Sequence, residues 1–216
     1  MLSKYDIDKR LYLAALAILA WTAVVLQLYL ILAHRVASVP ETILRFFSFF
    51  TILTNILVAL CCTLVLFKPG SGWGAFFGRP QTMTALTLYI AVVGIIYNVI
   101  LRMLWSPRGL QFVVDELLHS VVPLLFFLYW LFFVPKNALH WKHIFPWLLY
   151  PTLYCVFILV RGALSGFYPY PFVNVHELGY GPVLRNAAGI VVVFLLIAVV
   201  LTGAAKIIGR TTGKNN

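Results

Sequence analysis

Six long apolar segments dominate the sequence and restrict what the chain can fold into. A helix needs around 20 mostly apolar residues to cross a hydrocarbon core of about 30 Å. We therefore predict an all-α polytopic membrane protein, in which six transmembrane helices form one bundle and a single domain over residues 1–216. The predicted spans are Leu11–Ala33, Leu44–Phe67, Thr82–Leu104, Val113–Val134, Ile144–Val160 and Val183–Ile208.

The composition excludes several other classes of protein. Hydrophobic residues make up 62% of the chain and charged residues 10%, whereas a soluble domain carries about 25% charged residues. This balance excludes an ordinary soluble enzyme, a disordered segment and a disulfide scaffold. The net charge of +10 belongs to a chain too apolar to be a solvated basic domain, so we expect no nucleic-acid partner. The first apolar segment is longer than the core of a signal peptide, and we expect it to remain in the mature protein.

The placement of Lys and Arg predicts the orientation of the bundle. With six spans both termini lie on one side, and ten basic residues fall on that side, including Lys4, Lys9 and Lys214. Six fall on the other side, and all six are Arg. The positive-inside rule therefore predicts that both termini are cytoplasmic, and we expect the chain in a bacterial plasma membrane.

Polar residues within the predicted spans gather at the outer ends of the helices. An ionisable group costs at least about 2.5–3.5 kcal/mol at the centre of a bilayer, so such groups normally face one another or a wet cavity. We predict one polar pocket in the outer half, covered by the aromatic segment 162–182. Pro123 lacks the N–H that would bond the carbonyl of His119, so the helix should bend there. The gathered residues are Arg45, Ser48, Thr51, Thr54, Asn55, Tyr97, Asn98, Arg102, Asp115, Glu116, His119, Ser120, Arg161, Arg185 and Asn186.

These residues could support nucleophilic catalysis, in which a base activates a hydroxyl and a third group orients the base. Thr51 or Thr54 would be the nucleophile and His119 the base. The orienting acid would be Asp115 or Glu116, the oxyanion donor would be Asn55 or Asn98, and an anionic group would bind Arg102 or Arg161.

Structural roles compete with this interpretation. Ser and Thr often bond their own helix, and Asp115 could cap its helix. Arg45, Arg161 and Arg185 could extend to head groups. His140 and His143 lack a nearby acid or Cys, and we predict neither a metal nor a cofactor.

Three short segments resemble one known family: Phe-Phe-Thr-Ile-Leu-Thr-Asn at Phe49–Asn55, Leu-His-Ser-Val-Val-Pro at Leu118–Pro123, and Gly-Phe-Tyr-Pro-Tyr-Pro-Phe at Gly166–Phe172. The chain resembles bacterial six-helix relatives of the androgen-induced membrane protein family, in helix order over most of its length. The resemblance implies hydrolysis of fatty acid esters of hydroxy fatty acids through Thr51 and His119. Here the interval from His to Pro is one residue shorter than in the family, and Thr54 offers a second Thr.

The leading hypothesis is an integral membrane hydrolase that acts on a lipid or fatty-acyl ester through Thr51 and His119. The alternative is a non-catalytic binder or transporter of an anionic lipid or carboxylate, with Arg102, Arg161 and Arg185 as its ligand-binding residues. A structural or sensory membrane subunit is a third possibility.

Overall fold

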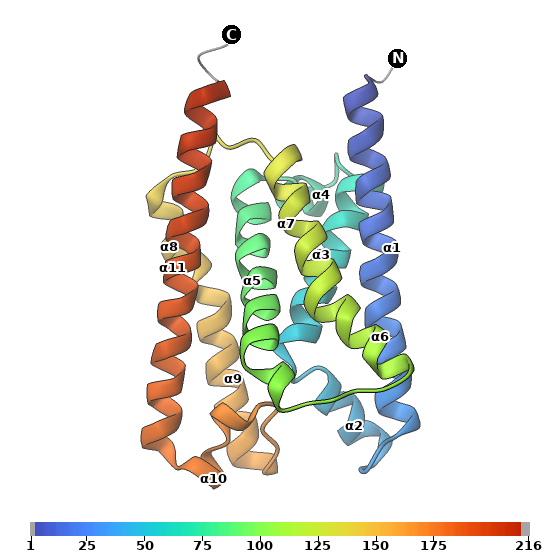
Figure 1. Cartoon of the computed structure of the whole chain (residues 1–216), viewed down its shortest axis with the longest axis vertical. Coiled ribbons are helices and arrows are strands. Elements are labelled where there is room, and N and C mark those ends of the chain that lie inside the picture. Colours follow the sequence, from blue (N-terminus) through green and yellow to red (C-terminus); the bar gives the residue numbers. More distant parts are fainter. Residues whose placement is uncertain (1–2, 213–216) are drawn as a thin grey trace.

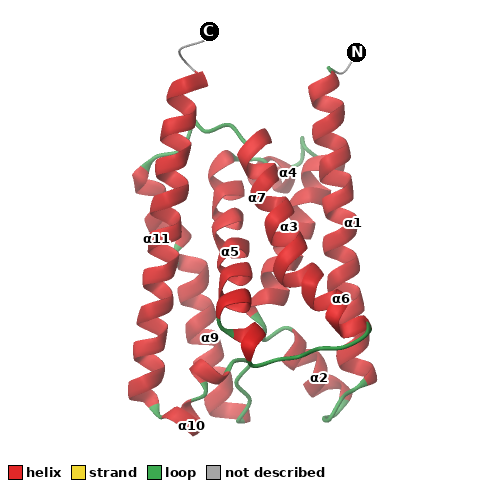
Figure 2. Cartoon of the chain, viewed as in Figure 1, coloured by secondary structure: helices red, strands yellow, loops and turns green. Residues whose placement is uncertain are grey.

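The structure, a computed structural model, describes residues 3–212 and is helical, with no strand among those residues (Figure 2). Six helical segments are long and apolar enough to cross a membrane. This result confirms the predicted class of all-α membrane bundle. The six segments are Lys4–Ala33, Phe50–Phe67, Pro80–Met103, Leu110–Phe133, Trp141–Ser165 and Tyr180–Arg210. Lys214, which the orientation prediction counts, lies outside the described residues.

Several of these segments contain more than one helical element, and short helices join others (Figure 1). The α-helices are α1 (Lys4–Ala33), α2 (Val39–Phe46), α3 (Phe50–Phe67), α4 (Gly72–Phe77), α5 (Pro80–Val99), α6 (Leu110–Glu116), α7 (Val122–Phe133), α8 (Ile144–Trp147), α9 (Leu149–Ser165), α10 (Val175–Leu178) and α11 (Tyr180–Thr212). Shorter turns of other geometry are η1 (Leu101–Met103), η2 (Leu117–Val121), η3 (Trp141–His143) and η4 (Pro171–Val173).

The helix α1 begins, and α11 ends, at the same end of the bundle (Figure 1). We call this the termini end and the opposite one the site end, where α2 and α10 lie. The helices α3 and α5 are central, since 56% of an apolar 18-residue stretch in each of these two spans is buried inside the bundle. The helix α1 packs along α3, and α5 packs against α3, α7 and α11. Residues near the start of α3 or the end of α5 are therefore held at the centre of the site end.

The predicted span Leu44–Phe67 is wrong at its start, because the chain leaves the helix after Phe46 and re-enters it at Phe50. The first two amides of α3 have no helical carbonyl to bond, and tyrosine hydroxyls from distant segments take their place. Phe50 N donates to Tyr154 Oη at 3.2 Å, and Thr51 N donates to Tyr170 Oη at 3.4 Å. Arg45 and Ser48 consequently lie outside α3, so Ser48 does not share a helix with Thr51 and Asn55.

The chain around His119 forms a π-helical turn, η2, between α6 and α7. Val122 N bonds the carbonyl of Leu117, five residues earlier, while Pro123 has no N–H to offer His119. The helix α5 lies very close to this turn at Gly94, which has no side chain. A Cβ added to Gly94 would lie only 3.1 Å from the carbonyl oxygen of His119. The irregularity expected beside His119 is therefore present as a π turn, a feature that is frequent at functional sites.

Lys136 follows α7 at the termini end of the bundle, and its side chain bonds main-chain carbonyls at the end of that helix. Its Nζ donates to the carbonyls of Trp130, Leu131 and Val134. The side chain is buried, and burial lowers the pKa of Lys136 to about 8. This basic residue therefore stabilises a helix end, as cations do near the last carbonyls of a helix.

Candidate functional site

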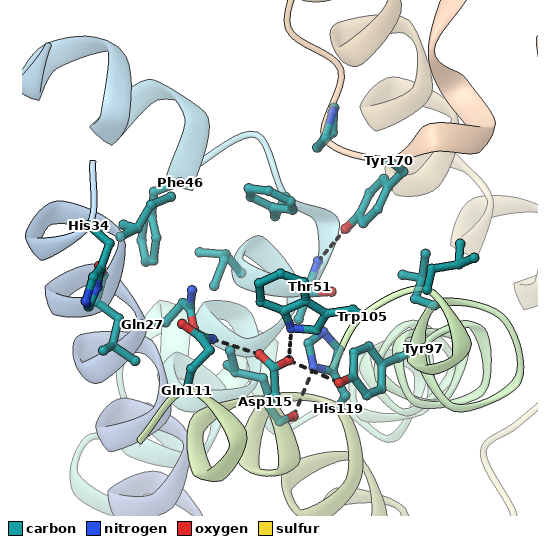
Figure 3. A pocket seen from close by; sticks show the side chains of 18 of the residues that line it. Gln27, His34, Phe46, Thr51, Tyr97, Trp105, Gln111, Asp115, His119 and Tyr170 are labelled. Carbon is teal, nitrogen blue, oxygen red and sulfur yellow. Dashed lines mark hydrogen bonds between the residues drawn. The ribbon is translucent and has the colours of Figure 1, made fainter. Parts of the chain in front are cut away.

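A cavity of about 910 Å³ lies at the site end. Its walls come from α1, the start of α3, the end of α5, the segment from Leu101 to His119, and the strap, by which we mean residues 166–174 between α9 and α10. Figure 3 shows the side chains that point into this polar cavity. Its polar and aromatic lining includes Gln27, His34, Phe46, Thr51, Tyr97, Trp105, Arg108, Gln111, Asp115, His119 and Tyr170.

Thr51 and Thr54 occupy different environments, although both belong to α3. Thr51 lies in the first turn and lines the polar cavity, with 7% of its surface exposed. Thr54 is completely buried, and its Oγ1 lies 3.3 Å from the hydroxyl of Tyr150. Thr54 lines neither this cavity nor the apolar one described below. Of the two candidate nucleophiles, Thr51 is therefore the one that a ligand in the cavity can reach.

His119 lines the same cavity, and its ring is held on two sides. Its Nδ1 lies 2.9 Å from the main-chain carbonyl oxygen of Asp115. Because a carbonyl can only accept a hydrogen bond, Nδ1 carries the hydrogen and Nε2 of the neutral ring is a free base. The ring also stacks on Tyr97, with 3.8 Å between centroids and 11° between planes. The imidazole thus has a fixed tautomer and a fixed plane.

The Asp115 side chain is buried and accepts hydrogen bonds from three neutral groups (Figure 3). Tyr97 Oη donates at 3.0 Å, Trp105 Nε1 at 2.7 Å and Gln111 Nε2 at 2.9 Å. The main chain of Asp115, rather than its carboxylate, bonds His119. The carboxylate of Asp115 accepts a hydrogen bond from Tyr97, and the ring of Tyr97 stacks on His119. The carboxylate therefore positions the imidazole indirectly, by holding Tyr97 in place. Trp105 and Gln111 are site residues that were not predicted from the sequence, although Gln111 stands one helical turn before Asp115.

The amides of Asn55 and Asn98 bond carbonyls of the π turn. Asn55 Nδ2 donates to the carbonyl of Leu118 at 3.2 Å, and Asn98 Nδ2 donates to that of His119 at 3.2 Å. A π turn leaves main-chain carbonyls without their usual helical partners, so these two side chains stabilise the segment that carries His119. Neither asparagine lines either cavity.

None of the three arginines predicted to bind substrate, Arg102, Arg161 and Arg185, lines either cavity. Arg102 pairs with Glu116 and also donates to Ser120 Oγ at 3.2 Å. Arg185 is exposed on α11. A different arginine, Arg108, lines the polar cavity.

Arg161 and Arg45 both bind Glu41, at 3.1 and 2.8 Å. The two guanidinium groups hold the pKa of Glu41 below its ordinary value, chiefly through the hydrogen bond from Arg45. Both groups also lie over the ring of Phe167 in the strap, with Arg161 at 4.9 Å and Arg45 at 4.7 Å from its centroid. This cluster ties α2 and α9 to the strap.

The strap covers the polar cavity, as the sequence predicts, since residues 169–171 belong to its lining. Gly166 has a φ of +72°, which ends α9 and turns the chain into the strap. The ring of Tyr168 occupies the place where a side chain on Gly162 would stand. The glycine therefore lets the strap lie directly against α9.

A second cavity, of about 350 Å³, lies beside the first and is lined mainly by apolar side chains of α5, α9 and α11. Residues such as Val92, Ile158 and Phe194 form this apolar cavity. The two cavities share four lining residues, which are Thr51, Tyr97, Leu101 and Tyr170. Thr51 therefore stands at the boundary between a polar and an apolar compartment.

Comparison of the chain with known protein families, curated proteins and solved structures finds no match. The resemblance to the androgen-induced family accordingly depends on its three short segments. Each of these segments contributes at least one residue to the lining of the polar cavity, including Thr51, His119 and Tyr170.

Proposed function

We propose that this chain is an integral membrane hydrolase that cleaves lipid esters, with Thr51 as nucleophile and His119 as general base. The main support for this proposal is the position of Thr51. Its side chain borders the polar cavity that contains His119 and also the apolar cavity beside it. A lipid ester has the same division, because an apolar acyl chain meets a polar linkage at the carbonyl carbon.

The proposed reaction has two stages. Thr51 Oγ1 forms a bond to the ester carbonyl carbon while its proton moves to His119 Nε2. The tetrahedral intermediate then expels the alcohol oxygen, which takes the proton from His119, and an acyl-threonine remains. In the second stage a water molecule, deprotonated by His119, attacks the acyl group and releases the fatty acid and the Thr51 hydroxyl.

The tautomer of His119 suits this role. Its Nδ1 is engaged by a main-chain carbonyl, so Nε2 is the basic nitrogen. The stacking on Tyr97 and the three bonds to the Asp115 carboxylate fix the ring before a substrate arrives. A base that is already oriented needs no reorganisation during the proton transfer.

The apolar cavity would hold the acyl chain, and the larger polar cavity would hold the alcohol portion. We further propose that the chain lies in a bacterial plasma membrane with the termini end in the cytoplasm, on the basis of its Lys distribution. The site end would then open near the outer leaflet.

The alternative of a binder or transporter for an anionic ligand receives less support from the geometry. Of the arginines predicted to bind such a ligand, Arg102 and Arg161 already pair with Glu116 and Glu41. Arg108, which lines the polar cavity, is the arginine that an anion bound there would meet. Arg185 is exposed on α11 and does not line either cavity.

The proposal predicts hydrolysis that depends on chain length. Purified protein in nanodiscs should cleave 4-nitrophenyl esters, and kcat/KM should rise severalfold for each added methylene until the apolar cavity is filled. The reason is that burial of one methylene contributes about 0.8 kcal/mol. The measurement is the release of 4-nitrophenol from esters of acetate through palmitate, with empty nanodiscs as control. No release above that control for any ester would overturn the proposal.

A further inference from the structure

One hydroxyl of the strap lies beside Thr51 and has no part in the reaction described above. Tyr170 lines both cavities. Its Oη accepts a hydrogen bond from the main-chain N–H of Thr51 at 3.4 Å. The phenol of Tyr170 therefore lies at the same boundary between the cavities as Thr51. It approaches Thr51 from the strap, whereas Thr51 belongs to α3 (Figure 3).

The ring of Tyr170 is fixed by its aromatic neighbours. It stacks on Phe172, with 5.2 Å between centroids and 4° between planes. It also meets Phe49 edge to face, at 5.8 Å and 85°. Pro169 and Pro171 flank it in the chain and restrict the backbone on both sides. A hydroxyl held in this way is positioned before any ligand binds.

The hydrogen of Tyr170 is available for donation. In the contact with the Thr51 N–H the phenol oxygen is the acceptor, so that contact does not use the hydrogen of Tyr170. The hydroxyls of Thr51 and Tyr154 lie within hydrogen-bonding reach of the same phenol. The neighbouring Tyr154 differs, since its Oη accepts from Phe50 N and donates to the carbonyl of Ser48 at 2.7 Å. Burial raises the pKa of Tyr170 above its ordinary value, so the phenol keeps its hydrogen at neutral pH.

We propose that Tyr170 is a catalytic residue whose hydroxyl donates a hydrogen bond to the carbonyl oxygen of the ester while Thr51 attacks. This inference rests on the proposed hydrolase function. When Thr51 Oγ1 bonds to the carbonyl carbon, the π electrons of the C=O bond move onto oxygen. The hydrogen bond from Tyr170 strengthens as that charge develops, and its proton is not transferred. When the intermediate collapses, the electrons re-form the C=O bond.

A pair of tyrosine variants tests this role. Tyr170→Phe keeps the ring and removes the hydroxyl beside Thr51, while Tyr150→Phe removes the hydroxyl that meets Thr54. Loss of one oxyanion donor reduces kcat by about 100-fold or more. We therefore expect Tyr170→Phe to lower kcat about 100-fold with little change in KM, and Tyr150→Phe to leave kcat within about threefold of the wild-type value.

An inhibitor pair separates this catalytic role from a merely structural one. A fatty-chain trifluoromethyl ketone adds to a nucleophilic hydroxyl and forms an oxyanion, whereas the matching methyl ketone remains unreacted. Tyr170→Phe should weaken inhibition by the trifluoromethyl ketone about 100-fold and leave inhibition by the methyl ketone unchanged. Equal weakening of both would overturn the proposal, because it would show damage to the cavity instead of loss of an oxyanion donor.

The failure of this inference is distinct from the failure of the proposed function. If Thr51→Ala abolishes hydrolysis and Tyr170→Phe retains the wild-type kcat, Tyr170 has no catalytic role and the hydrolase proposal stands. If Thr51→Ala retains full hydrolysis, the proposed function itself fails, and the proposal for Tyr170 fails with it.

Discussion

Replacing Thr51 by Ala is expected to reduce kcat/KM for lipid-ester hydrolysis by about 10³-fold or more, as removal of a nucleophile does in other hydrolases. The change removes the hydroxyl of a residue that lines both cavities. It should affect stability little, because the N–H of Thr51 still bonds Tyr170 and Ala favours a helix. The measurement is ester hydrolysis by the purified variant, with the thermal unfolding midpoint as a check of folding.

Two variants serve as controls for this result. Thr51→Ser keeps a hydroxyl on the same atom and should retain measurable turnover. Thr54→Val removes a hydroxyl that meets Tyr150 outside both cavities, and it should leave kcat/KM within about threefold of wild type. A large loss in Thr54→Val together with full activity in Thr51→Ala would reverse the assignment of the nucleophile.

The second large effect is expected at His119. The change His119→Gln keeps a polar side chain of similar length but removes the basic nitrogen, so the Thr51 hydroxyl would have no group to accept its proton. General base catalysis contributes about 10² to 10⁴-fold, and we expect kcat to fall by about 10³-fold. The hydrolysis assay of the purified variant measures this loss.

Combining the two substitutions distinguishes a shared mechanism from two independent contributions. Residues that act as a unit give losses that are far from additive. The double variant Thr51→Ala with His119→Gln should therefore be no more than about threefold slower than the slower single variant. Losses that multiply would show that Thr51 and His119 do not cooperate in one step.

The sequence predicts the helical bundle well, because long apolar segments have few other folds available. It also predicts that polar groups gather at one end, since their positions along the six spans place them there. Thr51, Asp115 and His119 do share one cavity. These features follow from hydropathy and helical spacing, which depend on neighbouring residues in the chain.

Features that depend on distant partners could not be predicted in the same way. The start of α3 at Phe50 depends on hydroxyls of Tyr154 and Tyr170, which lie more than 100 residues later. The roles of Asn55 and Asn98 follow from a π turn, and no local pattern shows which carbonyls such a turn leaves free.

The partners of Asp115 show the same limit. Trp105 and Gln111 carry no charge and lie between the predicted spans Thr82–Leu104 and Val113–Val134. The bond from Trp105 arises only where the segment between these spans folds back against α6. The bond from Gln111 is a local contact within α6, but an uncharged side chain does not mark it in the sequence. Tyr170 similarly belongs to a segment that the sequence identifies as a cover, without indicating which side chain approaches Thr51.

Covalent labelling tests the central claim most directly. A long-chain fluorophosphonate should react with the purified wild-type protein, stop ester hydrolysis and leave a single phosphonylated residue that peptide mass spectrometry identifies as Thr51. The same reagent should fail to label the Thr51→Ala variant. Modification of Thr54 or any other residue in the inhibited protein, with Thr51 unmodified, would contradict the account.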